Sequence, residues 1–295
     1  MPRAALLSIH ARVKKTGPLA LDDPSLVQVW GPRYSVFVVA ERDLAVFTLG
    51  RLPDGGRIRQ RAEDLAARVR HLLGRRRMPY DDAGRAIGVH GNMLRYAALT
   101  GTLAIRWEGA RRPLLWTVPP PEIEPVEATR ELARRFLRVF GPTGPEAFAR
   151  WAGIALAKAI STFADLRAEL LEVRAPWGNA CLLADDEVTL RAHGAPDGGV
   201  RLLPSGDAYT LGNTRDERGL LAPDARRRAK LWTPRVWPGA LLVAGEIVGT
   251  WRRAGRTVTI DAWSRLSPAV RAAVVAEAES LPLPDAGQGI RVHLD

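Results

Sequence analysis

Cysteine is nearly absent from this chain of 295 residues, since Cys181 is the only one. A single cysteine excludes a disulfide framework within the chain and any zinc site built from several thiolates. The five histidines, at positions 10, 71, 90, 193 and 293, lack the spacing of metal ligands, and there is no phosphate loop, dinucleotide fingerprint or nucleophile elbow. We therefore expect neither a metal ion nor another cofactor.

Long apolar runs are also missing, because no stretch approaches the ~20 residues that cross a membrane. The first residues, MPRAALLSIHARVKK, contain only a short apolar stretch and no small-residue cleavage site. They do not form a convincing signal peptide. These absences predict a cytoplasmic protein without a membrane partner.

Lysine is scarce, because Lys14, Lys15, Lys158 and Lys230 are the only four among 43 basic residues. With 32 acidic residues, the formal net charge is +11 and the sequence pI is near 10.8. A GC-rich genome would explain why arginine is used in place of lysine. It would not explain the excess of basic over acidic residues. Because the planar guanidinium suits phosphates and base edges, this surplus favours a nucleic-acid partner.

A pattern of elements repeats at an offset of 65 residues. Each copy predicts a helix, a second helix, a glycine turn, a third helix and a β-hairpin. The offset pairs Gly88 with Gly153 and Ala83 with Phe148. This order is typical of a winged helix, whose last helix lies in the major groove of DNA and whose hairpin contacts the backbone or minor groove. Winged helices also serve as protein-interaction modules, so that alternative stays open.

The predicted fold is therefore α+β, with tandem winged-helix domains followed by a small C-terminal β-barrel. Residues 61–122 form the second winged helix and residues 123–190 the third, whereas residues 1–60 form an incomplete first copy without its front half. Composition changes near residues 185–199. Beyond that point, residues 200–295 alternate apolar and polar residues between glycine turns and include one helix, which together predict the barrel.

Polar residues on the helix after Gly88 are the strongest candidates for base contacts. Asparagine can pair with adenine and arginine with guanine in the major groove. The apolar neighbours Met93, Leu94, Ala97 and Ala98 are predicted to form the buried side. The alternative, in which the polar residues are only solvated, stays open. The candidates are His90, Asn92, Arg95 and Tyr96.

Basic residues in three further places are candidates for contacts with DNA phosphates or the minor groove. One place is the tip of the hairpin that ends the second copy. Another is the corresponding helix of the third copy, which is poorer in polar residues and favours a scaffold role. The last is the segment GTWRRAGR in the predicted barrel, where Trp251 is assigned to the core. In this order the residues are Arg111 and Arg112, Lys158, and Arg252 and Arg253.

Four phrases of the sequence resemble a known family: LVQVWGPRYSVFVVAERDLAVFTLGRLP, VFGPTGPEAFARWAGI, RLLPSGDAY and GEIVGTWRR. Over nearly its whole length the chain is similar to the bacterial winged-helix DNA-binding family that includes the azinomycin-resistance and interstrand-crosslink DNA glycosylases. The resemblance implies three winged helices and a β-barrel around duplex DNA. In the glycosylase members it also implies hydrolysis of the N-glycosidic bond of bulky alkylated or crosslinked purines.

The sequence departs from the glycosylases at their catalytic motif. The resemblance implies Gln-x-Gln or Gln-x-Asp just ahead of the helix that begins here at Pro2, with side chains that position the attacking water. Gln28 and Gln60 are the nearby glutamines, and neither has the motif or the position. No catalytic residue is therefore assigned, and the motif is expected to lie before the start of this chain.

The helix after Pro2 is the part of the first copy nearest to that motif. Its polar residues are candidates for DNA contacts without an assigned role. If this copy lacks its front half, the apolar residues between Leu6 and Val13 should be exposed. The candidates are Arg3, His10 and Arg12.

The sequence as a whole predicts a monomeric protein that binds double-stranded DNA and is associated with the nucleoid. Two alternatives remain for its activity, a DNA glycosylase and a non-catalytic DNA-binding regulator. A protein-interaction scaffold without affinity for DNA is a third.

Overall fold

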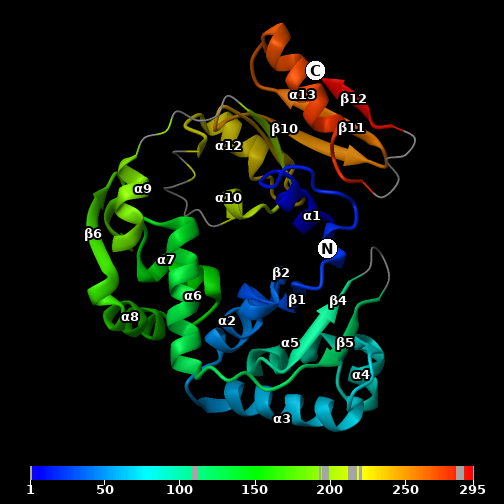
Figure 1. The fold of residues 1–295 in the computed structure, drawn as a ribbon, viewed down its shortest axis with the longest axis vertical. Coiled ribbons are helices and arrows are strands. Elements are labelled where there is room, and N and C mark those ends of the chain that lie inside the picture. The colour runs from blue at the N-terminus through cyan, green and yellow to red at the C-terminus, as the bar shows by residue number, and fades with distance from the viewer. Residues whose placement is uncertain are drawn as a thin grey trace. The chain divides into compact units, whose positions relative to one another are not determined.

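The computed structural model describes residues 2–107, 112–192, 194, 199–211, 218, 221–283 and 289–294. The chain forms two compact units (Figure 1). The first comprises Asp23–Arg191 with Pro2, and the second combines Arg3–Asp22 with Ala192–Asp295. The second unit is therefore built from both ends of the sequence, and the later of its boundaries falls within the composition change at residues 185–199.

One antiparallel sheet joins two hairpins in the first unit. Its strands are β1 (Leu26–Trp30), β2 (Val36–Ala40), β3 (Met78–Pro79), β4 (Leu103–Arg106) and β5 (Leu114–Thr117), in the order β2-β1-β4-β5-β3 (Figure 1). A single pair, Gln28 with Ile105, joins β1 to β4. The buried Gln28 side chain reinforces it, since Oε1 accepts from Trp107 N at 2.9 Å and Nε2 donates to Trp107 O at 3.4 Å.

Three helices between these hairpins form a core with the sheet's second hairpin, namely α3 (Gly56–Leu73), α4 (Tyr80–Ala86) and α5 (Leu94–Ala97). A further helix, α2 (Leu44–Thr48), follows β2 and packs against β1 and the later helix α6 (Pro125–Phe140). Leu65, Val69 and Leu73 fall on one face of α3 and are buried, because their spacing matches the helical period. This face packs against Leu94 of α5 and Leu115 of β5.

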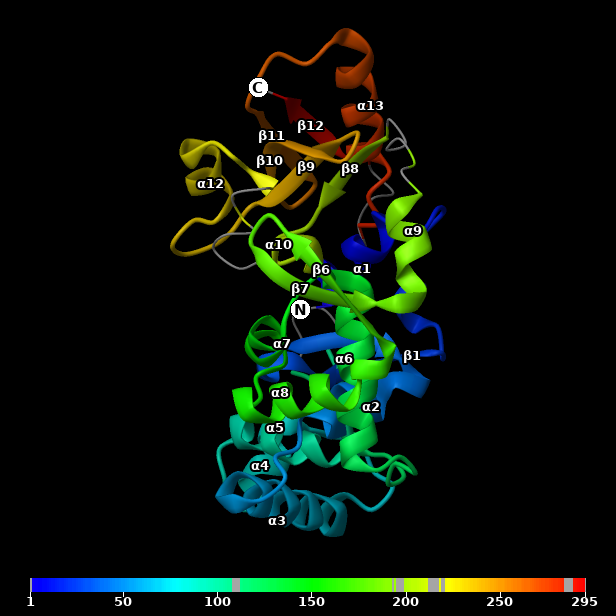
Figure 2. The ribbon, with the colours of Figure 1, turned by 90° about the vertical axis from the view of Figure 1, so that its left-hand side faces the viewer.

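The remainder of the first unit is mostly helical (Figure 2). It contains α6 (Pro125–Phe140), α7 (Pro145–Ala152), α8 (Leu156–Asp165), the hairpin β6 (Leu170–Ala175) with β7 (Gly178–Leu183), and α9 (Glu187–Arg191). Proline occupies the first position of α6 and of α7. It suits a helix start, because an N–H at that position would have no partner within the helix and its absence costs nothing. Phe136 and Phe148 are almost completely buried, with their rings 5.4 Å apart at the centre of this core.

The 65-residue offset seen in the sequence is confirmed by the order of elements. It moves Tyr80, the first residue of α4, onto Pro145, the first residue of α7. Gly88 and Gly153 follow these helices with φ of 70° and 72°, a left-handed conformation that glycine adopts without steric cost. The predicted glycine turns therefore have one backbone geometry in both copies.

The second unit contains an open five-stranded sheet. Its strands are β8 (Val200–Leu203), β9 (Gly239–Val243), β10 (Glu246–Ala254), β11 (Thr257–Ala262) and β12 (Arg291–Leu294), in the order β12-β11-β10-β9-β8. All pairs are antiparallel except β11 with β12. In the part of the chain that the structure describes, β8 and β12 are edge strands, so the predicted barrel is not closed. Alternation of apolar and polar residues predicts strands, but it does not determine whether the two edge strands pair and close the sheet into a barrel.

Helices cover both faces of this sheet (Figure 2). They are α12 (Ala225–Leu231) and α13 (Pro268–Glu279), with the short α10 (Ala208–Leu211) after β8. Val274 and Ala278 of α13 pack against Trp251, while Leu231 of α12 packs against Ile247 on the other face. The assignment of Trp251 to the core is confirmed, because it is 5% exposed and its Nε1 donates to Leu203 O at 2.7 Å.

The first helix, α1 (Pro2–His10), corrects one expectation from the sequence. Leu6, Leu7 and Ala11 are buried rather than exposed, and only Val13 remains open at 54% exposure. Leu7 joins the α13 side of the sheet core, and Ala11 joins the α12 side. The sequence-based expectation failed because α1 packs within the second unit, against residues more than 180 positions later in the chain.

Candidate nucleic-acid interface

The helix predicted to read bases begins with two exposed polar residues. His90 caps a 3-10 turn, since its Nδ1 accepts from Asn92 N at 3.2 Å, and the Asn92 side chain is exposed. A close approach fixes this turn on α4, because a Cβ on Gly84 would lie 2.8 Å from Gly91 Cα. On the opposite side Leu94, Ala97 and Ala98 are fully buried and Met93 is partly buried, as the spacing predicts.

Arg95 and Tyr96, the other two candidates on this helix, are half-buried. The Tyr96 ring meets Tyr34 of the β1–β2 turn edge-on, with centroids 5.0 Å apart. The Arg95 guanidinium lies 5.7 Å from the Tyr34 ring and 5.9 Å from the Tyr96 ring. Its Nε is buried and has no hydrogen-bond partner among the described atoms. A base-reading role for these residues stays a prediction, whereas their packing on Tyr34 was not foreseen.

Arg51 is the most buried cation of this cluster. It is 3% exposed, its Nε donates to Ala152 O at 2.8 Å, and its Nη1 donates to Trp30 O at 3.2 Å. Its guanidinium lies 4.8 Å from the Tyr34 ring. Burial lowers the pKa of Arg51 to about 10, so it stays protonated at neutral pH. Arg51 therefore connects the end of α7, the end of β1 and the Tyr34 ring.

The hairpin β4–β5 holds the next pair of candidates, of which Arg111 lies outside the described residues. Arg112 is exposed, and its Nη1 donates to Asp82 Oδ1 at 3.1 Å. The same oxygen also accepts from Arg85. Arg112 is thus attached to the first turn of α4, close to the helix predicted to read bases.

Lys158 of α8 is already engaged within the first unit. Its ammonium donates to Asp54 Oδ1 at 2.6 Å and to Leu52 O at 2.8 Å, and its side chain is 11% exposed. The outer side of α8 carries Leu156 and Ile160, which are about half exposed. Lys158 therefore has a structural contact, and the interpretation of this helix as scaffold rather than reader stays a prediction.

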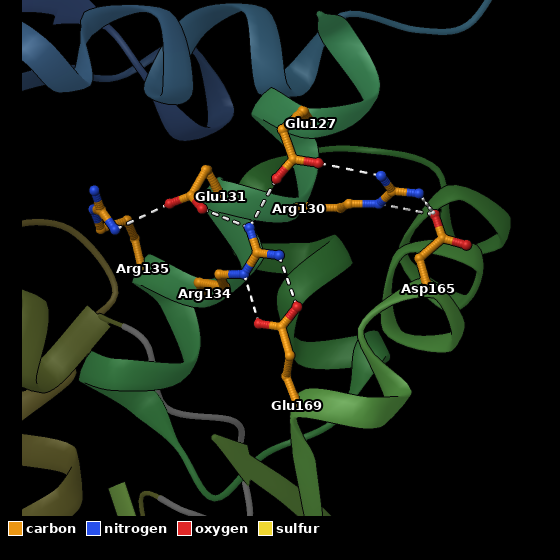
Figure 3. A network of polar contacts seen from close by, with 7 residues as sticks. All are labelled: Glu127, Arg130, Glu131, Arg134, Arg135, Asp165 and Glu169. Carbon is orange, nitrogen blue, oxygen red and sulfur yellow. Dashed lines mark hydrogen bonds and ion pairs between the residues drawn. The ribbon is translucent and has the colours of Figure 1, made fainter. Parts of the chain in front are cut away.

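An ion-pair network engages three of the arginines of α6, Arg130, Arg134 and Arg135 (Figure 3). Arg134 is at its centre, with Nε and Nη2 both 2.8 Å from the two carboxylate oxygens of Glu169, and Nη1 2.9 Å from Glu127 and 2.5 Å from Glu131. Arg130 and Arg135 extend the network with further carboxylates, namely Asp165 and Asp43. Because acidic side chains outnumber arginines in this network, this side of α6 is a poor surface for phosphates.

The network has a pH dependence whose sign is fixed by two carboxylates. Hydrogen bonds from Arg134 lower the pKa of both Glu127 and Glu169. A lowered pKa contributes stability that is present above the ordinary carboxylate pKa and is lost as the pH falls through the folded-state value. We expect Arg134→Met to have a lower thermal unfolding midpoint than the original chain at pH 7. The midpoints of the two proteins should converge below about pH 4. Arg138→Met, on the exposed part of α6, is the control, and a midpoint difference constant with pH would contradict the prediction.

The predicted hairpin residues of the second unit differ in their surroundings. Arg252 is exposed on the α12 side of β10, and its Nη2 donates to Val236 O at 2.9 Å. Arg253 is half-buried, and its Nη1 donates to Gly255 O at 2.5 Å. A shallow groove next to Arg252 is lined by Thr233, Pro234, Arg235, Val236 and Arg252.

The candidates on α1 and in the turn after it lie in the second unit. Both terminal nitrogens of Arg12 are bound to the buried carboxylate of Asp207, at 2.9 and 2.7 Å. His10 Nε2 lies 3.1 Å from Ser280 Oγ. For Arg3 the structure describes only the backbone, as part of α1. Arg12 therefore has a structural contact, and a DNA contact by any of the three remains a prediction.

Sequence reasoning missed the arginines of α12, although the run ARRRAK is visible in the sequence. Nothing in the sequence placed this run beside Arg252. In the structure Arg227 lies 5.6 Å from the Trp263 ring, and Lys230 pairs with Asp261 at 3.0 Å. We call the exposed cations of this area the α12 basic surface, which consists of Arg226, Arg227, Lys230, Arg235 and Arg252.

Two classes of feature are not found in the described ranges. No three His, Cys, Asp or Glu side chains there converge as metal ligands. Among the described helices, none is both long enough and apolar enough to cross a membrane.

Comparison with known proteins assigns the chain to a family. Residues 1–282 match the family described as DNA glycosylase AlkZ-like, so the chain belongs to that family, and the resemblance stated from the sequence is confirmed. The chain is similar to the interstrand DNA cross-link repair glycosylase of Streptomyces sahachiroi, with 28% identity over 187 residues. That match covers 53% of this chain and 49% of the relative, about half the length of each.

A solved structure extends the likeness to the whole fold. The Streptomyces sahachiroi DNA glycosylase AlkZ matches with a TM-score of 0.78 at 19% identity. The match covers 99% of this chain and 89% of that one. At this identity the match establishes the fold, and the α-helical and β-sheet composition predicted from the sequence is confirmed.

Proposed function

We propose that this protein binds duplex DNA as a monomer and acts as a DNA glycosylase on bulky alkylated or crosslinked purines. The observation that carries the proposal is the family match over residues 1–282, which includes both compact units. The relative named as an interstrand cross-link repair glycosylase supports this class of substrate. Association with the nucleoid would follow from the DNA binding.

The proposal includes winged helices as the DNA-binding modules. Residues 61–122 have a helix, a short strand, two short helices and a hairpin in winged-helix order, and residues 123–190 repeat the helices and hairpin. The hairpin β1–β2 within residues 1–60 would be the wing of a first copy. Bases would be contacted from the second copy by His90, Asn92, Arg95 and Tyr96.

The chemistry requires little from the protein beyond orientation and electrostatics. Alkylation at N7 puts positive charge on the purine, so the bond from C1′ to N9 breaks with its electron pair moving to the base. Water adds to C1′ and loses a proton, which leaves an abasic site and a neutral alkylpurine. A positioned water and a stabilised sugar cation are sufficient for this step.

A second candidate is a DNA-binding protein that does not release bases. It is favoured by the contacts of Gln28, because both the oxygen and the nitrogen of its side-chain amide are hydrogen-bonded to the backbone of Trp107. Gln60 is exposed on α3 without a second glutamine beside it in sequence. Neither residue has the arrangement of a water-positioning glutamine pair, and no residue is assigned to that task.

The two candidates are separated by incubation with a duplex that carries one bulky N7-alkylguanine. We expect strand breaks at that nucleotide after alkaline treatment, which cleaves abasic sites, and none in the unmodified duplex. Salt-dependent binding without breaks would support the second candidate instead. Absence of binding even at low salt would exclude both, because phosphate contacts are strongest there.

A further inference from the structure

The turn between β1 and β2 has an unusual backbone. Gly31 N donates to Ser35 O at 2.8 Å, and the two residues at its tip, Arg33 and Tyr34, have φ of 53° and 58°. Residues other than glycine rarely adopt positive φ, because the Cβ then clashes with the backbone. Two adjacent residues in this conformation must be held by their surroundings.

Aromatic and cationic groups hold the Tyr34 side. Its ring contacts Tyr96 at 5.0 Å between centroids and covers the guanidinium of Arg51 at 4.8 Å. Arg95 approaches the same ring at 5.7 Å. The ring is thereby fixed between α5 and the arginine that binds the carboxyl end of α7.

The glycine turn of the third copy, at Gly153, packs against the other residue of the tip, Arg33. A Cβ on Gly153 would lie 3.4 Å from Arg33 N, Cα and Cγ, so the two turns are in van der Waals contact. The backbone of Arg33 is therefore fixed between the turn that precedes α8 and the cluster beside α5.

The Arg33 side chain, in contrast, is exposed and has no polar partner among the described residues. Two further cations, the buried Arg51 and the half-buried Arg95 with its unpartnered Nε, lie against the ring of the neighbouring Tyr34. This arrangement holds the backbone of Arg33 in place and leaves its guanidinium available to an anion, with two other cations next to the adjacent residue. It also places that group where the second and third copies of the repeat meet.

We propose that Arg33 binds a phosphate of the DNA backbone and fixes the duplex across the second and third copies. This inference rests on the proposed DNA binding, and it adds a contact that the base-reading candidates do not include. A guanidinium suits a phosphodiester because it can donate two parallel hydrogen bonds. The contact is independent of base sequence, since phosphates carry no sequence information.

The test compares Arg33→Gln with Arg42→Gln in the full chain. Arg42 is also exposed, unpaired among the described residues and close in sequence, so the two variants lose the same charge. We measure the Kd for an undamaged duplex over a series of salt concentrations. Arg33→Gln is expected to reduce the salt slope by about one unit and to weaken binding about fivefold at 0.15 M salt. Arg42→Gln is expected to leave both unchanged.

Arg33→Lys separates a lost charge from a distorted turn. It keeps one positive charge at the same position and is expected to retain the slope with a small loss of affinity. If Arg33→Gln and Arg42→Gln bind alike while the original chain binds DNA, the Arg33 contact is wrong and the proposed function is unaffected. If the original chain does not bind DNA at any salt concentration, the proposed function itself is wrong.

Discussion

Asp207→Ala is expected to lower the free energy of opening of α1 by about 2 kcal/mol, because it removes a buried carboxylate that accepts hydrogen bonds from the half-exposed Arg12 and from two other donors. The Asp207 side chain is completely buried and accepts from Ser8 Oγ at 2.6 Å, from Arg12 at 2.7 and 2.9 Å, and from Tyr209 N at 2.9 Å. Its removal leaves those donors without their acceptor. The expected result is faster hydrogen exchange of the α1 amides from Leu7 to Ala11.

The control for this prediction is Asp261→Ala in the same unit. Asp261 also pairs with a cation, Lys230, but both side chains are about half exposed. Exposed pairs contribute little, so a change below about 0.5 kcal/mol is expected. Equal protection of α1 in the two variants would show that Asp207 does not hold this helix.

Removing two of the five cations of the α12 basic surface is expected to weaken DNA binding about thirtyfold at 0.15 M salt. Arg226→Gln combined with Arg235→Gln removes two exposed cations whose side chains pair with no described carboxylate. If each contacts a phosphate, the salt slope falls by about 1.8 units. Kd values for duplex DNA over a salt series measure both quantities.

A matched pair of arginines in the second unit serves as the control. Arg271 of α13 and Arg291 of β12 are also exposed, and their replacement by glutamine removes the same charge. Arg271 belongs to the helix that covers the opposite face of the sheet from α12. A slope reduced equally by both double variants would indicate a general effect of net charge and not a contact surface.

Local patterns predicted much of the fold because their causes are local. Helical spacing predicted the buried side of the helix at Leu94, and the conformational freedom of glycine predicted matching turns at Gly88 and Gly153. The alternation of apolar and polar residues similarly predicted a strand around Trp251, with this side chain in the core. In each case the residues and their neighbours in sequence determine the outcome.

Contacts between distant segments were not predictable in the same way. Arg95 was assigned to base reading because its position on the helix is polar, but Tyr34, which it contacts, lies in another hairpin. Arg12 and its partner Asp207 are 195 residues apart, and neither residue type indicates the other. Arg51 is an arginine among many in this sequence, and only the packing of three segments distinguishes it.

The second unit combines segments from both ends of the chain, so its two parts are synthesised at different times. Ser8 leaves the ribosome 199 residues before Asp207, which corresponds to roughly 10–40 s of translation. During that interval the apolar residues Leu6 and Leu7 lack the strands and helices that later bury them. The nascent amino-terminal segment therefore keeps apolar side chains exposed for the whole time in which the residues of the first unit are synthesised.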